Sequence, residues 1–240
     1  MKLLRRHKAV LLVLGIYWPV IFWLTHIPVP DVARQSGMSD KTMHVLAYFA
    51  LTFLVWFAVS PYQKAGWGNL KVWIVLATVI GYAAIDEYLQ GYVGRSVDVQ
   101  DFIADVFGIV LGLGMLSVFG FWPAMLLSAA FFIFVISNMS NLLLLYRQYY
   151  LNGVFHLTAY TAFTLIWMQY LERHSKPRSS RALWLMTLMA IPMLLLLGIK
   201  VTATFFDRPF AWIDIATGLL GICAAILMSG AAFRMSGGKK

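Results

Sequence analysis

Acidic side chains gather in one short stretch of an otherwise apolar chain. Residues 82–112 hold five of the ten Asp and Glu residues. Apolar runs lie on both sides of this stretch, at 72–84 and 106–119. Carboxylates close to a bilayer are energetically costly, and they are usually paired or functional. We therefore expect this stretch to carry the functional site and the rest of the chain to hold it in place.

A histidine on the second predicted helix has polar neighbours at helical spacing. Asp40, His44 and Tyr48 are four residues apart and would share one helix face. An acid that orients the imidazole would make His44 a candidate general base. The alternative is a polar seam between helices, in which each hydrogen bond contributes only about 0.6–2 kcal/mol. Asp40 could also serve only as the N-cap of this helix.

The third predicted helix ends in a second polar group. Glu87 and Gln90 are three residues apart and share a face, whereas Asp86 points about 100° away from Glu87. We therefore predict that only Glu87 faces the centre of the protein. The alternative is an interfacial carboxylate exposed to lipid headgroups.

The loop that follows contains an arginine. The planar guanidinium of Arg95 could bind a phosphate or pair with the nearby carboxylates, because its fork geometry suits both. By itself, an Arg–Asp pair is usually structural. Asp98, three residues later, is a predicted N-cap for the fourth helix.

Four residues form one stripe along the fourth predicted helix, at steps of four, three and four. Gly108 and Gly112 make a GxxxG pattern, which permits close contact between membrane helices. The two acids of the stripe therefore face a neighbouring helix and need partners there. These acids are Asp101 and Asp105, and the available partners are Lys41, His44 and Arg95.

Other kinds of site have little support in the sequence. A histidine with several carboxylates offers hard metal ligands, but no spacing here is diagnostic, so we expect no metal and no cofactor. The sequence contains no GxSxG, P-loop, HExxH or CxxC motif.

The composition identifies the class of protein that must position these residues. Mean hydropathy is +0.76, and 61% of residues are apolar. Charged residues make up 12%, about half the ~25% usual in soluble proteins. We therefore predict an all-α, polytopic membrane protein that contacts the lipid bilayer. The net charge of +9 would suggest nucleic acid in a soluble protein, but membrane topology explains it better, and we expect no nucleic-acid partner. The single cysteine, Cys223, excludes an intrachain disulfide.

The charge distribution predicts the topology. With a cytoplasmic N-terminus, 13 of the 19 Lys and Arg residues lie inside, as the positive-inside rule requires. Both termini are then cytoplasmic, and nine of the ten acidic residues lie in the outer half. The predicted spans are 8–27, 42–60, 71–91, 100–119, 122–139, 153–171, 182–203 and 211–230.

The sequence also contains an internal repeat. A shift of 112 residues places His44 and Tyr48 over His156 and Tyr160. An even number of predicted spans separates the copies, so they would be parallel four-helix units, at 1–120 and 121–240. The second copy has lost much of the chemistry, which predicts one active and one structural half. A shift of 113 aligns Arg95, Asp101 and Gly108 with Arg208, Asp214 and Gly221, but Glu87 with Lys200, Gln90 with Ala203 and Asp105 with Gly218.

These motifs, taken in order and spacing, resemble the VanZ-like family, which is named for a teicoplanin-resistance protein. The resemblance covers about residues 20–118. The sequence differs from the family pattern at Asp105, where Asn is usual. It implies a bacterial inner-membrane protein linked to the cell envelope and, in some members, to low-level glycopeptide resistance. The residues that carry it are Asp40, Lys41, His44, Tyr48, Glu87, Gln90, Arg95, Asp98, Asp101, Asp105, Gly108 and Gly112.

Three functions stay open at this point. The first is an outward-facing polar pocket that binds an anionic lipid or a lipid-linked envelope precursor, with Arg95 and Lys41 at the phosphate. The second is an intramembrane enzyme acting on a lipid-linked substrate, with His44, Glu87 and Asp101 as the candidate catalytic residues. The third is a purely structural role for the polar residues, with function residing in a protein partner.

Overall fold

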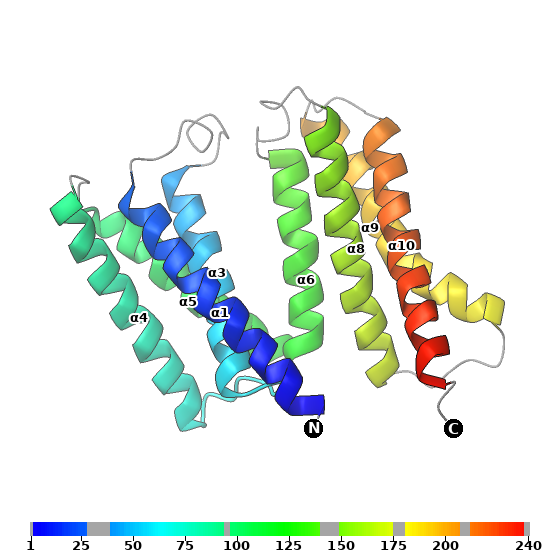
Figure 1. Cartoon of the computed structure of the whole chain (residues 1–240). Coiled ribbons are helices and arrows are strands. Elements are labelled where there is room, and N and C mark those ends of the chain that lie inside the picture. Colours follow the sequence, from blue (N-terminus) through cyan, green and yellow to red (C-terminus); the bar gives the residue numbers. More distant parts are fainter. Residues whose placement is uncertain are drawn as a thin grey trace. The chain divides into compact units, whose positions relative to one another are not determined.

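The computed structural model describes residues 2–27, 39–93, 97–139, 149–174, 181–206 and 212–237 (Figure 1). Every regular element in these ranges is a helix, which confirms the all-α prediction. The chain divides into two compact units, Met1–Ala124 and Met125–Lys240.

The first unit consists mainly of four long helices. They are α1 (Lys2–His26), α3 (Asp40–Val59), α4 (Leu70–Gln90) and α5 (Val99–Phe119), and a 3-10 turn, η1 (Gly91–Val93), extends α4. The most extensive contact in this unit is between α3 and α5, and α1 packs on both α3 and α4.

Glycine allows α3 and α5 to approach closely. A methyl group on Gly108 would lie 3.1 Å from the Phe49 amide nitrogen and would overlap the Val45 carbonyl oxygen. One turn further along α5, a methyl group on Gly112 would lie 3.2 Å from the side chain of Thr52. The predicted GxxxG contact is therefore confirmed, and its partner helix is α3.

Side-chain caps fix where α3 and α5 begin. Ser39 accepts a hydrogen bond from the Thr42 amide at 3.1 Å, so Ser39 is the N-cap of α3. The prediction that Asp40 caps this helix is wrong; Asp40 is its first helical residue, where a negative charge complements the helix dipole. Asp98 accepts from the Gln100 amide at 2.8 Å, which confirms it as the N-cap of α5.

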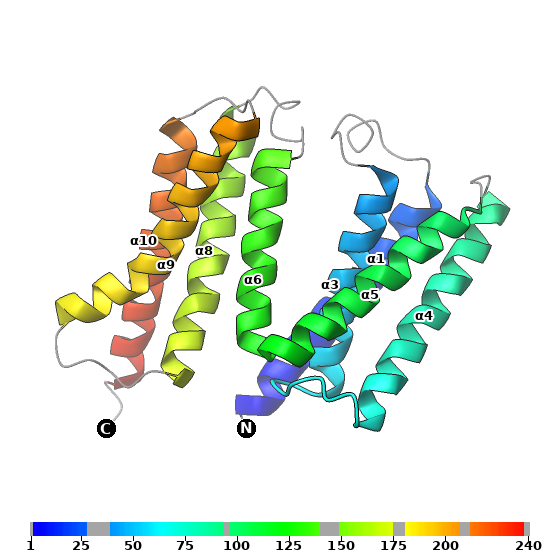
Figure 2. The ribbon, with the colours of Figure 1, turned by 180° about the vertical axis from the view of Figure 1, so that it is seen from behind.

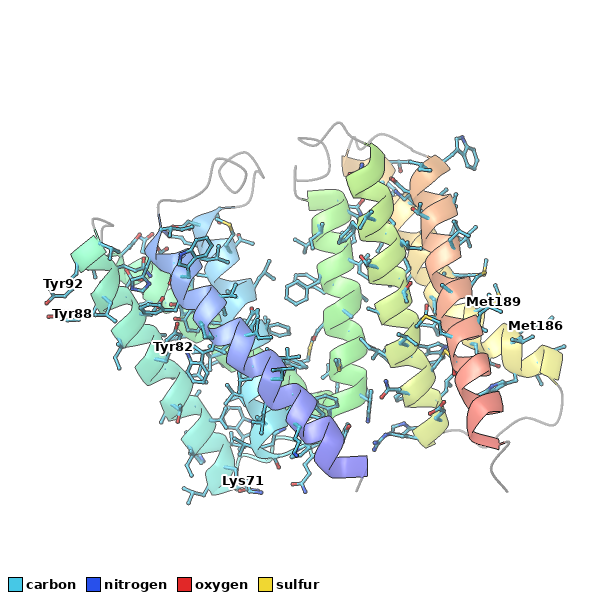
Figure 3. The ribbon with its side chains drawn as sticks, in the orientation of Figure 1. Lys71, Tyr82, Tyr88, Tyr92, Met186 and Met189 are labelled. Carbon is cyan, nitrogen blue, oxygen red and sulfur yellow. The ribbon has the colours of Figure 1, made fainter. Side chains whose placement is uncertain are left out.

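Aromatic pairs mark both ends of α4. The rings of Trp67 and Trp73 are 5.8 Å apart near its start, and those of Tyr88 and Tyr92 are 5.3 Å apart at its end. The two tyrosines project outward from the helix bundle, whereas Lys71 marks the opposite end of α4 (Figure 3). Trp and Tyr concentrate at membrane interfaces, and the 21 residues of α4 span about 32 Å, close to the thickness of a bilayer core.

The second unit is also a helix bundle (Figure 2). Its principal contact is between α8 (Tyr149–His174) and α10 (Trp212–Gly237). Gly221 of α10 faces the Leu157 carbonyl oxygen of α8, which a methyl group would overlap. The core of the bundle includes the fully buried side chains of Tyr160 and Ile222. Its helices are α6 (Phe121–Phe134), η2 (Val135–Met139), α8 (Tyr149–His174), α9 (Arg181–Ala203), η3 (Thr204–Phe206) and α10 (Trp212–Gly237), the first of which begins in the preceding unit.

Six of the described helical segments are long and apolar enough to cross a membrane. The chain is therefore a multi-pass membrane protein. The apolar part of α1, Val10–His26, is shorter, and α8 is not among the six, so the count of eight spans stays a prediction. The six segments are Asp40–Val59, Leu70–Val93, Val99–Phe119, Phe121–Asn138, Ala182–Ala203 and Trp212–Ser229.

Candidate functional site

The acidic residues in the described part of the first unit lie at one end of its helix bundle. This is the end at which α3 and α5 begin and α4 finishes (Figures 1 and 2). Lys64 lies between the end of α3 and the start of α4, and Lys71 lies in the first turn of α4, so both belong to the opposite end. The acidic residues within the described part of this unit are Asp40, Asp86, Glu87, Asp98, Asp101 and Asp105.

His44 is held between two aspartates of α5. Its Nδ1 lies 2.8 Å from Oδ1 of Asp105, a distance at which the ring N–H donates to the carboxylate. Its Nε2 lies 4.0 Å from Oδ2 of Asp101. His44 is 5% exposed and Asp105 1%. The close contact between α3 and α5 thus joins the two predicted motifs, and Asp105 fixes the orientation of the imidazole ring.

Lys41 bridges two carboxylates at the rim of the cluster. Its Nζ is 3.3 Å from Oδ2 of Asp98 and 3.4 Å from Oδ1 of Asp101. The lysine side chain is 45% exposed, so these ion pairs contribute little stability and the ammonium group can reach other anions. The Gln100 amide, and to a lesser degree Lys41, lower the pKa of Asp98 below its ordinary value.

Asp40 adds a third ligand-type group beside His44 and Asp101. One side-chain oxygen or nitrogen atom from each of these residues lies within 4.8 Å of the other two. Asp40 and His44 are one turn apart on α3, and Asp101 lies in the first turn of α5.

Glu87 closes the cluster from α4. Its Oε1 accepts a hydrogen bond from the backbone amide of Asp98 at 2.6 Å. Its Oε2 is buried and has no hydrogen-bond partner. Glu87 is only 4% exposed, as expected for a side chain that faces the interior, and not for one exposed to headgroups.

The prediction that Asp86 points away from the interior is wrong. Asp86 is 1% exposed, because α1 packs against this second face of α4. Oδ1 of Asp86 lies 3.7 Å from Nδ1 of His26, the last residue of α1. Three side chains donate hydrogen bonds to the carboxylate: Thr25 and Tyr82 at 3.2 Å and Gln90 at 3.4 Å.

Gln90 and Tyr48 therefore belong to the Asp86 side of the site. Gln90 donates to Asp86 and not to Glu87, the acid whose face it was predicted to share. The ring of Tyr48 is fully buried and lies 5.9 Å from that of Tyr82. Sequence reasoning did not identify His26, Thr25 or Tyr82 as site residues, although a His and a Thr at the end of an apolar run were a detectable signal.

An apolar groove adjoins this side of the site. It has a volume of about 560 Å³ and is lined by α1 and by one residue of α4, Tyr82. Leu14, Trp18 and Phe22 are among the α1 residues. Tyr82 thus lines the groove and also donates a hydrogen bond to the buried carboxylate of Asp86.

The arrangement of the cluster is strongly acidic. Lys41 is its one described side chain with a permanent positive charge, beside six carboxylates and two histidines. Ten residues were predicted to form the ligand site, namely the family-motif residues other than Gly108 and Gly112. The structure brings nine of them together. The tenth, Arg95, lies outside the described residues, as does its repeat partner Arg208.

The second unit has a reduced version of the same arrangement. Nδ1 of His156 lies 3.9 Å from Oδ1 of Asp214, and it is also 2.8 Å from the backbone oxygen of Asn152, to which the ring donates. Nζ of Lys200 lies 2.6 Å from Oδ2 of Asp214. Lys200 and Asp214 are 8% and 6% exposed. A buried ammonium group therefore neutralises this aspartate.

Comparisons with known proteins agree with the motif pattern of the first unit. The family model described as VanZ/LLP1 matches residues 6–120. No curated protein and no solved structure shows a significant match. The matched region contains the whole acidic cluster, from Asp40 to Asp105, and nearly all of the first unit. The predicted resemblance is confirmed: the N-terminal half of this membrane protein is a domain of the VanZ/LLP1 family.

Proposed function

We propose that this protein binds the headgroup of an anionic lipid, or of a lipid-linked precursor of the cell envelope, at the acidic cluster of its first unit. The observation that carries the proposal is the position of Tyr82. One side of this residue lines an apolar groove, and its hydroxyl reaches a buried carboxylate of the cluster. A ligand with an apolar chain and a polar head would suit both environments.

The groove provides the environment for the chain of such a ligand. Its volume of about 560 Å³ lies within the usual range for small-molecule sites, about 300–1,000 Å³. Its lining by Leu14, Trp18 and Phe22 favours a hydrocarbon tail. The exposed side chains of α1 around it, including Leu12 and Trp23, suit contact with lipid.

The rim of the cluster provides the environment for the headgroup. Lys41 is exposed enough to meet a phosphate group, and we assign Arg95 the same role. His44 and Glu87 would orient polar groups of the ligand, while Asp98, Asp101 and Asp105 hold the basic side chains in place. Phosphate binding by Lys and Arg follows from their charge and donor geometry.

The proposed orientation places this cluster on the outer side of the inner membrane. Lys64 and Lys71 belong to the opposite end of the first unit, and the positive-inside rule assigns that end to the cytoplasm. Both termini would be cytoplasmic. Handling of an envelope precursor on the outer side would also provide a route to glycopeptide (teicoplanin) resistance.

We further propose that the two halves arose by duplication of a parallel four-helix unit. Gly108 and Gly221 face a carbonyl oxygen at equivalent positions, those of Val45 and Leu157. Elsewhere on these helices, Thr52 donates to the Tyr48 carbonyl and Thr164 to the Tyr160 carbonyl, both at 2.7 Å. Such agreement in helix contacts and in side-chain hydrogen bonds supports a common origin.

Native mass spectrometry of the protein purified in mild detergent tests the headgroup proposal. We expect a phosphate-bearing lipid to co-purify with the wild type and to be depleted in Lys41→Gln and Arg95→Ala. Lys71→Gln is the matched control, because it removes the same charge at the other end of the unit. Equal lipid retention in all four proteins would refute the proposal.

A second function is favoured by the contact between His44 and Asp105. A buried imidazole oriented by a carboxylate is the usual arrangement of a general base, so the cluster could act on a lipid-linked phosphate or glycan. For an enzyme, His44→Gln should abolish turnover while ligand binding largely survives. For a binding protein, Arg95→Ala should cause the larger loss of affinity.

A further inference from the structure

We infer that the first unit binds a divalent cation between Asp40, His44 and Asp101. The inference deepens the proposed function, on which it rests for its biological purpose, but cation binding itself can be measured without any lipid. It also departs from the expectation, drawn from sequence spacing alone, that no metal site is present.

The spacing of the three side chains supports a shared cation. The ligand-type atoms of the three residues lie within 4.8 Å of one another. The gap of 4.0 Å between Nε2 of His44 and Oδ2 of Asp101 is too long for a hydrogen bond. Two ligand atoms about 2.0–2.2 Å from one tetrahedral metal ion lie roughly 3.3–3.6 Å apart, so small movements of these side chains toward one another would let them hold an ion.

The other nitrogen of the imidazole makes a contact that is typical of a metal-bound histidine. Nδ1 of His44 is 2.8 Å from the Asp105 carboxylate. Metal-binding histidines almost always donate their second N–H to a carboxylate or carbonyl group, which fixes the tautomer and directs the free nitrogen at the metal. Asp105 therefore leaves Nε2 of His44 as the free nitrogen, on the side of Asp101.

The same cluster contains a buried oxygen atom without a hydrogen-bond partner. Oε2 of Glu87 has no hydrogen-bond partner, although the residue is only 4% exposed. The Glu87 carboxylate is close enough to His44 and Asp101 to interact electrostatically with both. A buried carboxylate oxygen without a hydrogen-bond partner is costly, and a nearby cation would lower that cost.

The corresponding His–Asp pair of the second unit has a buried cation of its own. There Nζ of Lys200 lies 2.6 Å from Asp214, which lies 3.9 Å from the ring of His156. In the repeat alignment, Lys200 corresponds to Glu87, while Asp214 and His156 correspond to Asp101 and His44. The first unit thus keeps the His–Asp pair but has a carboxylate where the second unit has a buried ammonium group. Its own ammonium group, that of Lys41, is 45% exposed at the rim and lies 3.4 Å from Asp101. A cation from solution would restore the balance of charge.

The donor set indicates the class of cation. One imidazole nitrogen with carboxylate oxygens suits Mn²⁺ or Zn²⁺ better than Ca²⁺, which prefers oxygen ligands alone. Three protein ligands leave coordination positions open, and a phosphate oxygen of the proposed headgroup could occupy one of them. This would explain how a strongly acidic cluster can bind an anionic ligand.

Isothermal titration calorimetry of the full chain tests the site directly. The protein would be stripped with EDTA in detergent, freed of chelator and titrated with MnCl₂ and, separately, ZnCl₂. We expect one saturable site per chain for at least one of the two ions. We also expect Asp105→Asn to weaken binding about 10–100-fold, the usual effect of losing the partner of a metal-bound histidine, and His44→Gln to weaken it further.

Two further variants keep the result interpretable. His156→Gln removes the matching histidine of the second unit and should leave cation affinity unchanged. Asp40→Asn alters a partly exposed residue in the first turn of α3, so it should fold and still lose affinity. The inference is refuted if the wild type shows no saturable binding of either ion, or if His44→Gln and Asp40→Asn bind as tightly as the wild type. Because the titration measures the cation alone and no lipid is added, this outcome is distinct from that of the lipid-retention experiment.

Discussion

The substitution Gly108→Ala tests whether close approach of α3 and α5 builds the site. The added methyl group would overlap the Val45 carbonyl oxygen and lie 3.1 Å from the Phe49 amide nitrogen. Both atoms belong to the backbone of α3, so no flexible side chain can move aside, and the helices must separate. Overpacking of this kind typically costs about 1–3 kcal/mol.

Alanine also has a favourable effect in a helix. Replacing glycine in a helix interior gains about 0.5–1 kcal/mol. We therefore expect Gly108→Ala to lower the free energy of unfolding by about 1–2 kcal/mol. Gly114→Ala is the matched control in α5, because no atom lies within 4 Å of its added methyl group, and it should be neutral or stabilise by up to about 1 kcal/mol.

Unfolding by SDS in mixed micelles, followed by far-ultraviolet circular dichroism, would measure both variants. Separation of the helices would also lengthen the contact between His44 and Asp105, so Gly108→Ala should bind Mn²⁺ or Zn²⁺ more weakly than Gly114→Ala. The reasoning is refuted if Gly108→Ala is as stable as Gly114→Ala, because the α3–α5 contact would then be looser than described.

Three further predictions concern charge and topology. Lys200→Met should lower the free energy of unfolding by about 3–5 kcal/mol, because it leaves a buried Asp214 unpaired. The double variant with Asp214→Asn should recover much of this loss. If the losses of the two single variants simply added in the double variant, the pairing would be contradicted. The pKa of Asp98 is lowered on folding, so its charge stabilises the protein above the ordinary aspartate pKa of about 3.9, and this contribution disappears as the pH falls through the lowered value. Unfolding midpoints of the wild type and Asp98→Asn, which keeps a capping side chain, should therefore differ at pH 7 and converge at acidic pH; a constant difference would exclude a charge effect. In a Cys223→Ser background, Gly66→Cys should react with an impermeant maleimide only from the cytoplasmic side, and labelling from outside would reverse the topology.

The local chemistry of the first unit could be predicted because it follows helical spacing. Asp101, Asp105 and Gly108 had to share a face of one helix, and glycine at membrane helix contacts permits close approach. The need of buried carboxylates for partners then pointed to His44, which the structure places 2.8 Å from Asp105. Both steps depend on one helix and its nearest neighbour.

The features that could not be predicted depend on a third or fourth helix. Asp86 lies about 100° from Glu87 around α4, and nothing in the periodicity showed that α1 would bury this second face. The participation of His26 and Thr25 follows from that packing. The cap of α3 was missed for a different reason, because Ser39 and Asp40 are adjacent and both residue types are good N-caps.

Binding of a phosphate-bearing lipid with and without divalent cation tests the central claim most directly. The EDTA-stripped protein, in nanodiscs of neutral lipid, would be titrated with a polyprenyl phosphate in the presence and absence of Mn²⁺ or Zn²⁺. The account predicts saturable binding that tightens when the cation is added, and it predicts that this gain is lost in His44→Gln but kept in His156→Gln. No saturable binding under any condition would contradict the headgroup proposal. Binding that is equally tight with and without cation would contradict the cation's role in it.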